Sequence, residues 1–155
     1  MRYELTGPID NIRVPPPTLA RRADELWRHT CFELFLHDAQ SDAYEEFNFS
    51  PSGCWAAYKF SAYRQGMSGL NTMADPLITW LQSSQKAQLE VHLPRTMGGL
   101  MQRREKLAMG LSAVMEDCSG ALSHWSLHHP SSLPDFHHRE GFIAVLERSG
   151  PGSIE

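Results

Sequence analysis

Clustered histidines are the first sign of chemistry in this 155-residue chain, because neutral imidazole is a common metal ligand. Five of them fall in the C-terminal part: His124, His128, His129, His137 and His138. On a strand, the spacing of His124 and His128 separates them by about 13 Å, too far for one ion. A metal site would therefore need histidines to converge across the Pro130–Pro134 loop. We favour histidines that hydrogen-bond and order this loop, and keep a metal-dependent enzyme as a third hypothesis.

The same histidines, together with seven methionines, suggest a second chemistry, the axial ligation of haem iron. A b-type haem domain for electron transfer needs an apolar pocket and one or two axial ligands. The candidate axial residues are His128, His137, Met67 and Met73. We expect no cofactor, and haem b is possible under this alternative function.

Large aromatic rings suggest a third chemistry, the recognition of sugars, whose C–H faces pack on such rings. Most tryptophans are expected to fill a core, but polar residues crowd around Trp27 and Trp125. We therefore predict a carbohydrate site in which Trp27 and Trp125 stack on the sugar. The residues predicted to hydrogen-bond its hydroxyl groups are Arg22, His29, Asn48, His128 and Asp135.

Signatures of catalysis are absent from the sequence. It contains no Gly-x-Ser-x-Gly elbow, no His-Glu-x-x-His, no phosphate-binding loop and no dinucleotide fingerprint. Glu45 and Glu46 are adjacent, so on a strand they point to opposite faces and cannot act as a catalytic carboxylate pair. We therefore expect a non-catalytic binding module.

Composition and charge narrow the class further. Hydrophobic residues make up 41% and charged residues 21% of the chain, as in folded domains rather than disordered ones. The formal charge of −4 argues against nucleic-acid binding, which normally needs a basic surface. The three cysteines form no Cys-x-x-Cys pair, and no segment is long enough to span a membrane. The segment Met1–Val14 lacks the pattern of a signal peptide, so we expect a cytoplasmic protein.

An apolar period of two predicts the strands that must position these residues. Phe32, Leu34 and Leu36 face one way, and Phe47 and Phe49 do so in the next strand. The turn sequence from Ser50 to Gly53 predicts a hairpin that joins the segments 44–49 and 54–60. Further strands are predicted over 3–6, 88–93, 106–115 and 142–146.

The regular spacing of short strands and turns predicts an all-β fold, a β-sandwich of two antiparallel sheets of the immunoglobulin-like or jelly-roll-like kind. A short helix is expected near residues 18–27. We predict one domain over residues 1–148 and a disordered tail over 149–155.

Several longer strings resemble a known family. They span residues 24–36, 44–58, 110–114, 125–130 and 134–138, and include Asn-Phe-Ser-Pro-Ser-Gly and Pro-Asp-Phe-His-His. Together they resemble the bacterial DOMON-like domains, which are related to the family 9 carbohydrate-binding modules. The resemblance runs from about residue 3 to about residue 147.

This resemblance implies a β-sandwich with a ligand pocket, in a group whose members bind sugars or haem. Trp27 and Glu33 match the tryptophan and the acid that line the pocket of the sugar-binding modules. The family's first strand is shortened or missing here, which would leave a sheet with an open edge. We expect a small-molecule or oligosaccharide ligand and no nucleic-acid or membrane partner. A protein-interaction domain that uses the open edge is a further alternative, and the oligomeric state is not predicted.

Overall fold

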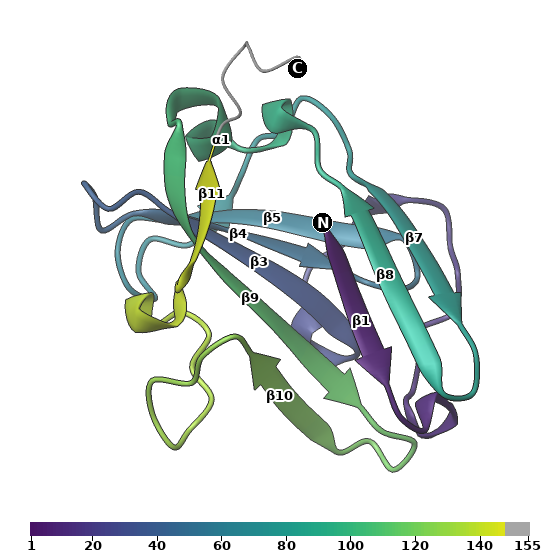
Figure 1. The fold of residues 1–155 in the computed structure, drawn as a ribbon. Helices are drawn as coiled ribbons and strands as arrows, with labels where there is room; N and C mark the ends of the chain where they lie inside the picture. Colours follow the sequence, from purple (N-terminus) through teal and green to yellow (C-terminus); the bar gives the residue numbers. More distant parts are fainter. Residues whose placement is uncertain (148–155) are drawn as a thin grey trace, which may run out of the picture.

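Alternating apolar residues form strands throughout residues 1–147, the part of the chain that the computed structural model describes. The fold is an all-β sandwich of two sheets (Figure 1). The small sheet has three strands in the order β1-β8-β7, and the large sheet has eight, with the path β10-β9-β3-β4-β5-β2. On the large sheet β11 also pairs with β9, and β6 with β5. The predicted fold class is confirmed.

Short helical segments and turns connect the strands of the two sheets. The small sheet consists of β1 Arg2–Thr6, β7 Leu77–Gln82 and β8 Lys86–His92. The large sheet consists of β2 Arg21–Arg22, β3 Cys31–His37, β4 Tyr44–Phe49, β5 Cys54–Phe60, β6 Ser68–Gly69, β9 Lys106–Glu116, β10 Leu122–Ser126 and β11 Ala144–Glu147. The helical segments are α1 Gly99–Arg103 and the 3-10 turns η1 Ile9–Asn11, η2 Leu26–Arg28, η3 Arg95–Met97 and η4 Arg139–Gly141. No helix within residues 1–147 has the length and apolarity needed to cross a membrane.

The core between the sheets is built from alternate residues of each strand. Phe32, Leu34 and Leu36 on β3 and Phe47 and Phe49 on β4 are at most 3% exposed and face the small sheet, as their alternation predicts. Each such burial stabilises the fold by about 1.5–3 kcal/mol relative to an exposed side chain. Buried residues of other strands that join this core are Trp55, Leu89, Val91, Leu107 and Met115.

Two strand predictions are confirmed, the hairpin of β4 and β5 and the strand over 106–115. β4 and β5 form the predicted antiparallel hairpin, with Phe49 opposite Trp55. Gly53 closes its turn at a φ of +92°, a conformation that residues with a side chain rarely adopt. The segment 106–115, whose composition also suits a helix, lies within β9 as predicted.

The short helix expected near residues 18–27 is only a single 3-10 turn, η2. Two residues of this segment pair instead with β5 as strand β2, with Arg21 opposite Cys54. Glu25 has a left-handed φ of +59°, which interrupts any right-handed helix at that point. At the other end of the chain, β11 begins at Ala144, two residues later than expected.

The outward face of the large sheet is buried as well. All residues of β3 and β4 are buried, although only one face of each packs on the small sheet. On the outward face a second apolar cluster includes Phe35, Tyr58 and Phe142. Leu26 and Trp27 from η2 and Phe136 from the segment 127–143 pack against it. The predicted tail over 149–155 lies outside the described residues.

Candidate functional site

The outward face of the large sheet carries a group of polar side chains that we call the acid cluster: Glu33, Glu46, Asn48 and Ser112. Strand register brings it together, because Glu33 on β3 lies directly opposite Asn48 on β4 and Ser112 on β9. Glu46 is two residues from Asn48 on the same strand, so it points to the same face. Each of the four residues is at most 4% exposed.

Hydrogen bonds inside the acid cluster leave one buried acceptor, Asn48 Oδ1, without a partner in the described part of the chain. Ser112 Oγ donates to Glu33 Oε2 at 2.9 Å, and Asn48 Nδ2 donates to Glu46 Oε1 at 2.8 Å. Asn48 Oδ1 is buried and accepts no hydrogen bond within residues 1–147, whereas Glu46 Oε2 lies 3.9 Å from His137 Nε2. A buried polar atom without a partner costs about 1–3 kcal/mol. The cluster is therefore suited to take hydrogen bonds from a molecule that enters it.

Burial also changes the protonation of both carboxyl groups. Desolvation, followed by the nearby negative charge of Glu46, raises the pKa of Glu33 to about 8. Desolvation raises the pKa of Glu46 to about 7, although the hydrogen bond from Asn48 opposes this shift. At neutral pH the pair therefore holds a proton and can donate a hydrogen bond as well as accept one.

Aromatic side chains line the rim of the acid cluster. Trp27 is half-buried, and its ring meets the Tyr58 ring edge to face, with the centroids 5.9 Å apart. Tyr58 lies opposite Glu46 across β4 and β5, and its hydroxyl donates to Asp24 Oδ1 at 2.7 Å. Trp27 and the acid cluster therefore occupy the same face of the sheet.

His137 closes the cluster from the segment 127–143. Its Nδ1 lies 2.7 Å from the Tyr44 hydroxyl, and its Nε2 lies 3.9 Å from Glu46 Oε2. Burial, followed by the positive charge of Arg64, lowers the pKa of His137 to about 4. The ring is therefore neutral at pH 7 and contributes hydrogen bonding rather than charge.

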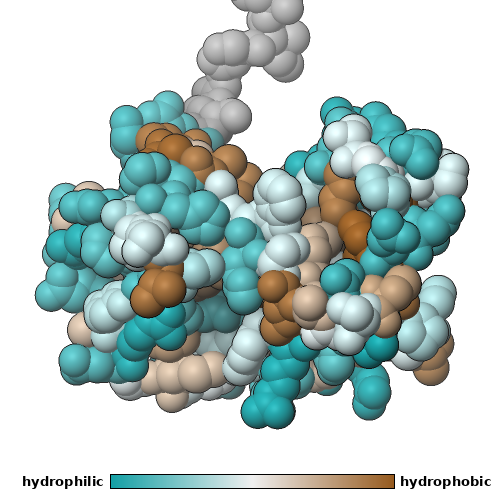
Figure 2. All heavy atoms as spheres, turned by 90° about the horizontal axis from the view of Figure 1, so that it is seen from below, coloured by the Kyte–Doolittle hydropathy of each residue, from teal (hydrophilic) through white to brown (hydrophobic). Residues whose placement is uncertain are grey.

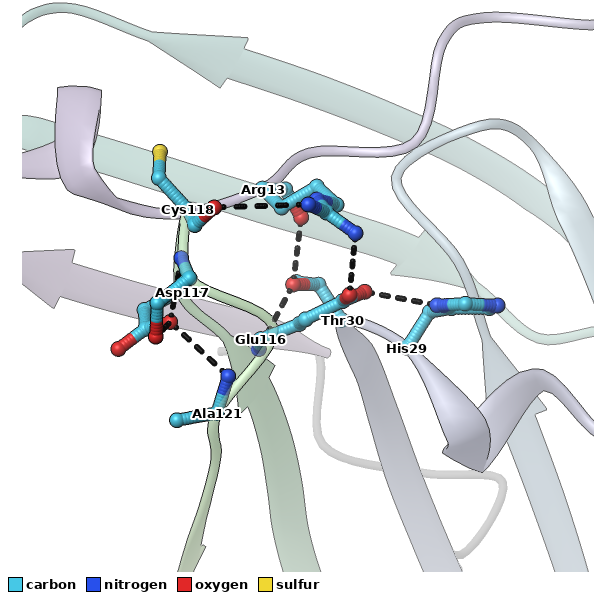
Figure 3. A network of polar contacts seen from close by, with 8 residues as sticks. Arg13, His29, Thr30, Glu116, Asp117, Cys118 and Ala121 are labelled. Atoms are coloured by element: carbon cyan, nitrogen blue, oxygen red, sulfur yellow. Dashed lines mark hydrogen bonds and ion pairs between the residues drawn. The ribbon is translucent and has the colours of Figure 1, made fainter.

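A second polar network ties the end of β9 to the N-terminal segment, and Figure 3 shows Arg13 and His29 reaching Glu116 from different sides. Arg13 Nη1 donates to Glu116 Oε1 at 2.8 Å, and His29 Nδ1 lies 2.7 Å from Glu116 Oε2. Thr30 Oγ1 accepts from the Glu116 backbone N–H at 3.1 Å and donates to the Arg13 carbonyl at 2.7 Å. Because its carboxylate is satisfied from both sides, Glu116 has a structural role.

The structure brings together only some of the residues predicted to bind a sugar. Trp27 and Asn48 share the outward face of the large sheet. Arg22 instead stacks on Trp55 and donates to the backbone carbonyls of Ala57 and Leu70, which holds β5 and its neighbouring segment together.

Asp135 and His128, two loop residues of the predicted sugar site, do not lie in the acid cluster. Asp135 accepts hydrogen bonds from the Tyr63 hydroxyl and from Arg64 Nη2, so it joins two loops. His128 is exposed in the segment after β10.

Trp125 lies on the opposite side of the large sheet from Trp27. It is 63% exposed and sits opposite Ala113, whose side chain faces the core between the sheets. Trp27 packs on the outward face instead. The two tryptophans therefore cannot clamp one small ligand between them.

The predicted haem ligands are scattered. Met67 and Met73 are 49% and 83% exposed, His128 is exposed, and His137 is bonded to Tyr44. Within the described residues, none of the four lines the apolar groove that β1 forms with the inner face of β9 and β10. The same part of the chain holds no group of three or more His, Cys, Asp or Glu side chains that could bind a metal ion.

The sequence interpretation missed Glu46 and Ser112 as site residues. It considered Glu46 only as a partner of Glu45, and the structure places these two on opposite faces, with Glu45 accepting a hydrogen bond from the Leu100 N–H at 3.0 Å. Because side chains alternate along a strand, the predicted strand over 44–49 implies that Glu46 and Asn48 share the face opposite to Phe47 and Phe49. Strand order was needed to place Glu33 and Ser112 beside them.

No protein-family model matches the chain, and no match is found among curated proteins or solved structures.

Proposed function

We propose that this domain is a non-catalytic module that binds a small polyhydroxylated ligand, a carbohydrate, at the acid cluster. The observation that carries the proposal is the buried Asn48 Oδ1, which has no hydrogen-bond partner within residues 1–147 and shares its face of the sheet with the carboxyl groups of Glu33 and Glu46. Hydroxyl groups are the natural complement of such a set, since each can donate to one acceptor and accept from a protonated carboxyl group.

Trp27 supplies the second element of sugar recognition, a large ring beside the polar groups. Its position on a three-residue turn rather than on a strand allows the ring to move without breaking sheet hydrogen bonds. Because Glu33 and Glu46 are almost fully covered, the ligand enters by displacing this ring or the segment 127–143. The resemblance to DOMON-like domains and family 9 carbohydrate-binding modules supports the proposal at Trp27 and Glu33.

The proposed site keeps Trp27 and Asn48 from the sequence interpretation and adds Glu33, Glu46 and Ser112. It has no place for Trp125, which lies across the sheet. This division supplies a matched pair of variants, because Trp27→Ala removes a ring of the site while Trp125→Ala removes a ring outside it.

The test is a titration of the folded protein with a panel of mono- and oligosaccharides, followed by NMR and calorimetry. We expect one class of saccharide to shift the Asn48 side-chain amide. Trp27→Ala and Glu33→Gln should weaken binding at least about tenfold, and Trp125→Ala should leave it unchanged. The proposal is wrong if no saccharide of the panel shifts the cluster, or if only Trp125→Ala abolishes binding.

An absorbance spectrum of the same preparation, before and after addition of haem, checks the alternative function. A stoichiometric Soret band with uptake of haem would replace the carbohydrate proposal by a redox one.

A further inference from the structure

A groove runs between the edge of the small sheet and the inner face of β9 and β10. Its volume is about 640 Å³. Figure 2, seen from the end of the molecule that carries the β9–β10 turn, shows a hollow between two lobes with hydrophobic residues beside it. The side chains that form its apolar lining include Tyr3, Leu5, Met115, Trp125 and Leu127.

The floor of the groove exposes large apolar side chains. Trp125 is 63% exposed and Leu127 is 49% exposed, although both lie against the core side of the large sheet. A three-stranded sheet does not extend far enough to cover an eight-stranded one. The inner face of β10 is one of the uncovered parts, and contiguous exposed apolar surface of this kind marks sites of interaction.

Strand β1 lines the groove and offers unpaired backbone groups. It pairs only with β8 within residues 1–147. Met1 and Val91 exchange backbone hydrogen bonds of 3.0 and 2.9 Å. In this antiparallel pair, Tyr3 and Leu5 therefore also direct their N–H and C=O groups toward β8. Alternate residues bond to β8, so the N–H and C=O groups of Arg2, Glu4 and Thr6 point away from it.

We infer that the groove is a docking site for an extended segment of a partner protein, which adds to β1 as a fourth strand of the small sheet. In such a strand, residues opposite Tyr3 and Leu5 point into the groove and reach Trp125, while the others face solvent. The segment therefore carries apolar residues at alternate positions. Backbone pairing supplies affinity and the apolar floor supplies selectivity.

The charged side chains that line the groove indicate which residue type suits an end of the docked segment. The groove is lined by Arg2 and three acids. Glu4 pairs with Arg2 and Lys86, and Glu116 pairs with Arg13 and His29, so within residues 1–147 Asp117 is the acid of this lining that has no ion pair. Hydrogen bonds from Ser119 and from the Ala121 N–H lower the pKa of Asp117, so its carboxylate stays ionised. A segment with a basic residue at the end next to Asp117 complements this rim.

A second copy of β1 is a poorer occupant than such a segment. In the antiparallel register that pairs all three outward-facing residues of two β1 strands, Glu4 lies opposite Glu4 of the other copy. Like charges directly opposite each other destabilise a strand pair.

The probe that tests the inference is a synthetic peptide, Lys-Val-Thr-Val-Thr-Val-Lys, with both ends blocked. We expect it to shift the NMR signals of the Trp125 indole and of the Arg2, Glu4 and Thr6 amides. In antiparallel pairing with β1, N-methylation of the threonine and lysine positions should abolish these shifts, because those N–H groups face β1. N-methylation of the valines should leave the shifts in place, because the N–H groups of the valines face away from β1.

Variants locate the site on the protein. Glu4→Pro removes one outward N–H without removing a bond to β8, so it should block the peptide while Glu4→Ala does not. Trp125→Ala should weaken binding on the order of tenfold, whereas Trp27→Ala should not change it. The inference is overturned if the peptide shifts none of these signals, or if sedimentation shows self-association that Glu4→Pro abolishes. Saccharide binding is unaffected by either result, so this inference and the proposed function fail separately.

Discussion

At the scale of single residues, the acid cluster places two carboxyl groups where water cannot reach them easily. The pKa of Glu33 is raised to about 8 and that of Glu46 to about 7, mainly because burial disfavours the charged form. Ser112 and Asn48 oppose these shifts through single hydrogen bonds. The cluster therefore reduces the stability of the fold at alkaline pH, as expected where polar groups are kept for a purpose other than stability.

Raising the pH from 6.5 to 8.5 should lower the free energy of unfolding by about 2 kcal/mol. The folded protein binds more protons than the unfolded chain between the ordinary carboxyl pKa of 4.5 and the raised values, so stability is lost as pH rises through this window. The lowered pKa of His137 acts in the opposite sense, but only between about 4 and 6.5. Urea unfolding at several pH values measures the slope.

Glu33→Gln supplies the control for this pH dependence. The variant keeps the size and the hydrogen bond of the side chain but cannot ionise, so most of the slope above pH 6.5 should disappear. A wild-type protein whose stability is constant or increases over this range would contradict the assignment of a raised pKa to Glu33.

At the scale of elements, β9 organises the large sheet. One edge pairs with β3, while the other pairs first with β11 and then with β10. Gly110 lies between these two partners and opposite Phe35. A Cβ atom at Gly110 would lie 2.6 Å from the Phe142 ring, which stacks on Phe35 with centroids 5.7 Å apart. The missing side chain therefore makes room for the residue that leads into β11.

Gly110→Ala should destabilise the protein by about 1–3 kcal/mol, because the added methyl group forces Phe142 and Phe35 apart. Gly141→Ala is the matched control, since a Cβ there has its nearest contact, the His128 carbonyl, at an ordinary 3.6 Å. Thermal and urea unfolding measure both variants. Equal stability of the two would mean that Phe142 moves without cost.

At the scale of the whole molecule, the unequal sizes of the two sheets produce two different surfaces. The outward face of the large sheet is covered by loops and contains the acid cluster, whereas the inner face of β10 is left partly open. Trp27 belongs to the first surface and Trp125 to the second. We therefore propose a carbohydrate site on the first surface and a docking site for an extended peptide segment on the second.

The stability effects of Trp27→Ala and Trp125→Ala should be additive. Loss of the half-buried Trp27 should cost about 1–2 kcal/mol and loss of the exposed Trp125 less than about 0.5 kcal/mol, because the latter buries little surface. Their sum should match the double variant within about 0.5 kcal/mol, since the rings share no contacts across the sheet. A larger coupling in urea unfolding would show that the two surfaces communicate.

The sequence by itself determined the position of several strands and which of their residues face the core, but it predicted no strand over Leu77–Gln82 or Leu122–Ser126. Alternation identified Phe32, Leu34 and Leu36 on β3 and residues 106–115 of β9, because a period of two is local information. Turn chemistry identified the β4–β5 hairpin. It erred over 18–27, where pairing with β5 and the left-handed Glu25 replaced the expected helix.

Only the tertiary structure decided which strands are neighbours. Glu33 and Ser112 are 79 residues apart and meet because β3 pairs with β9. The same strand order separates Trp27 from Trp125, buries Glu46, and leaves β1 at an edge. Each of these features depends on long-range pairing of the backbone, which is the same hydrogen bond for every residue type and therefore leaves little trace in local sequence.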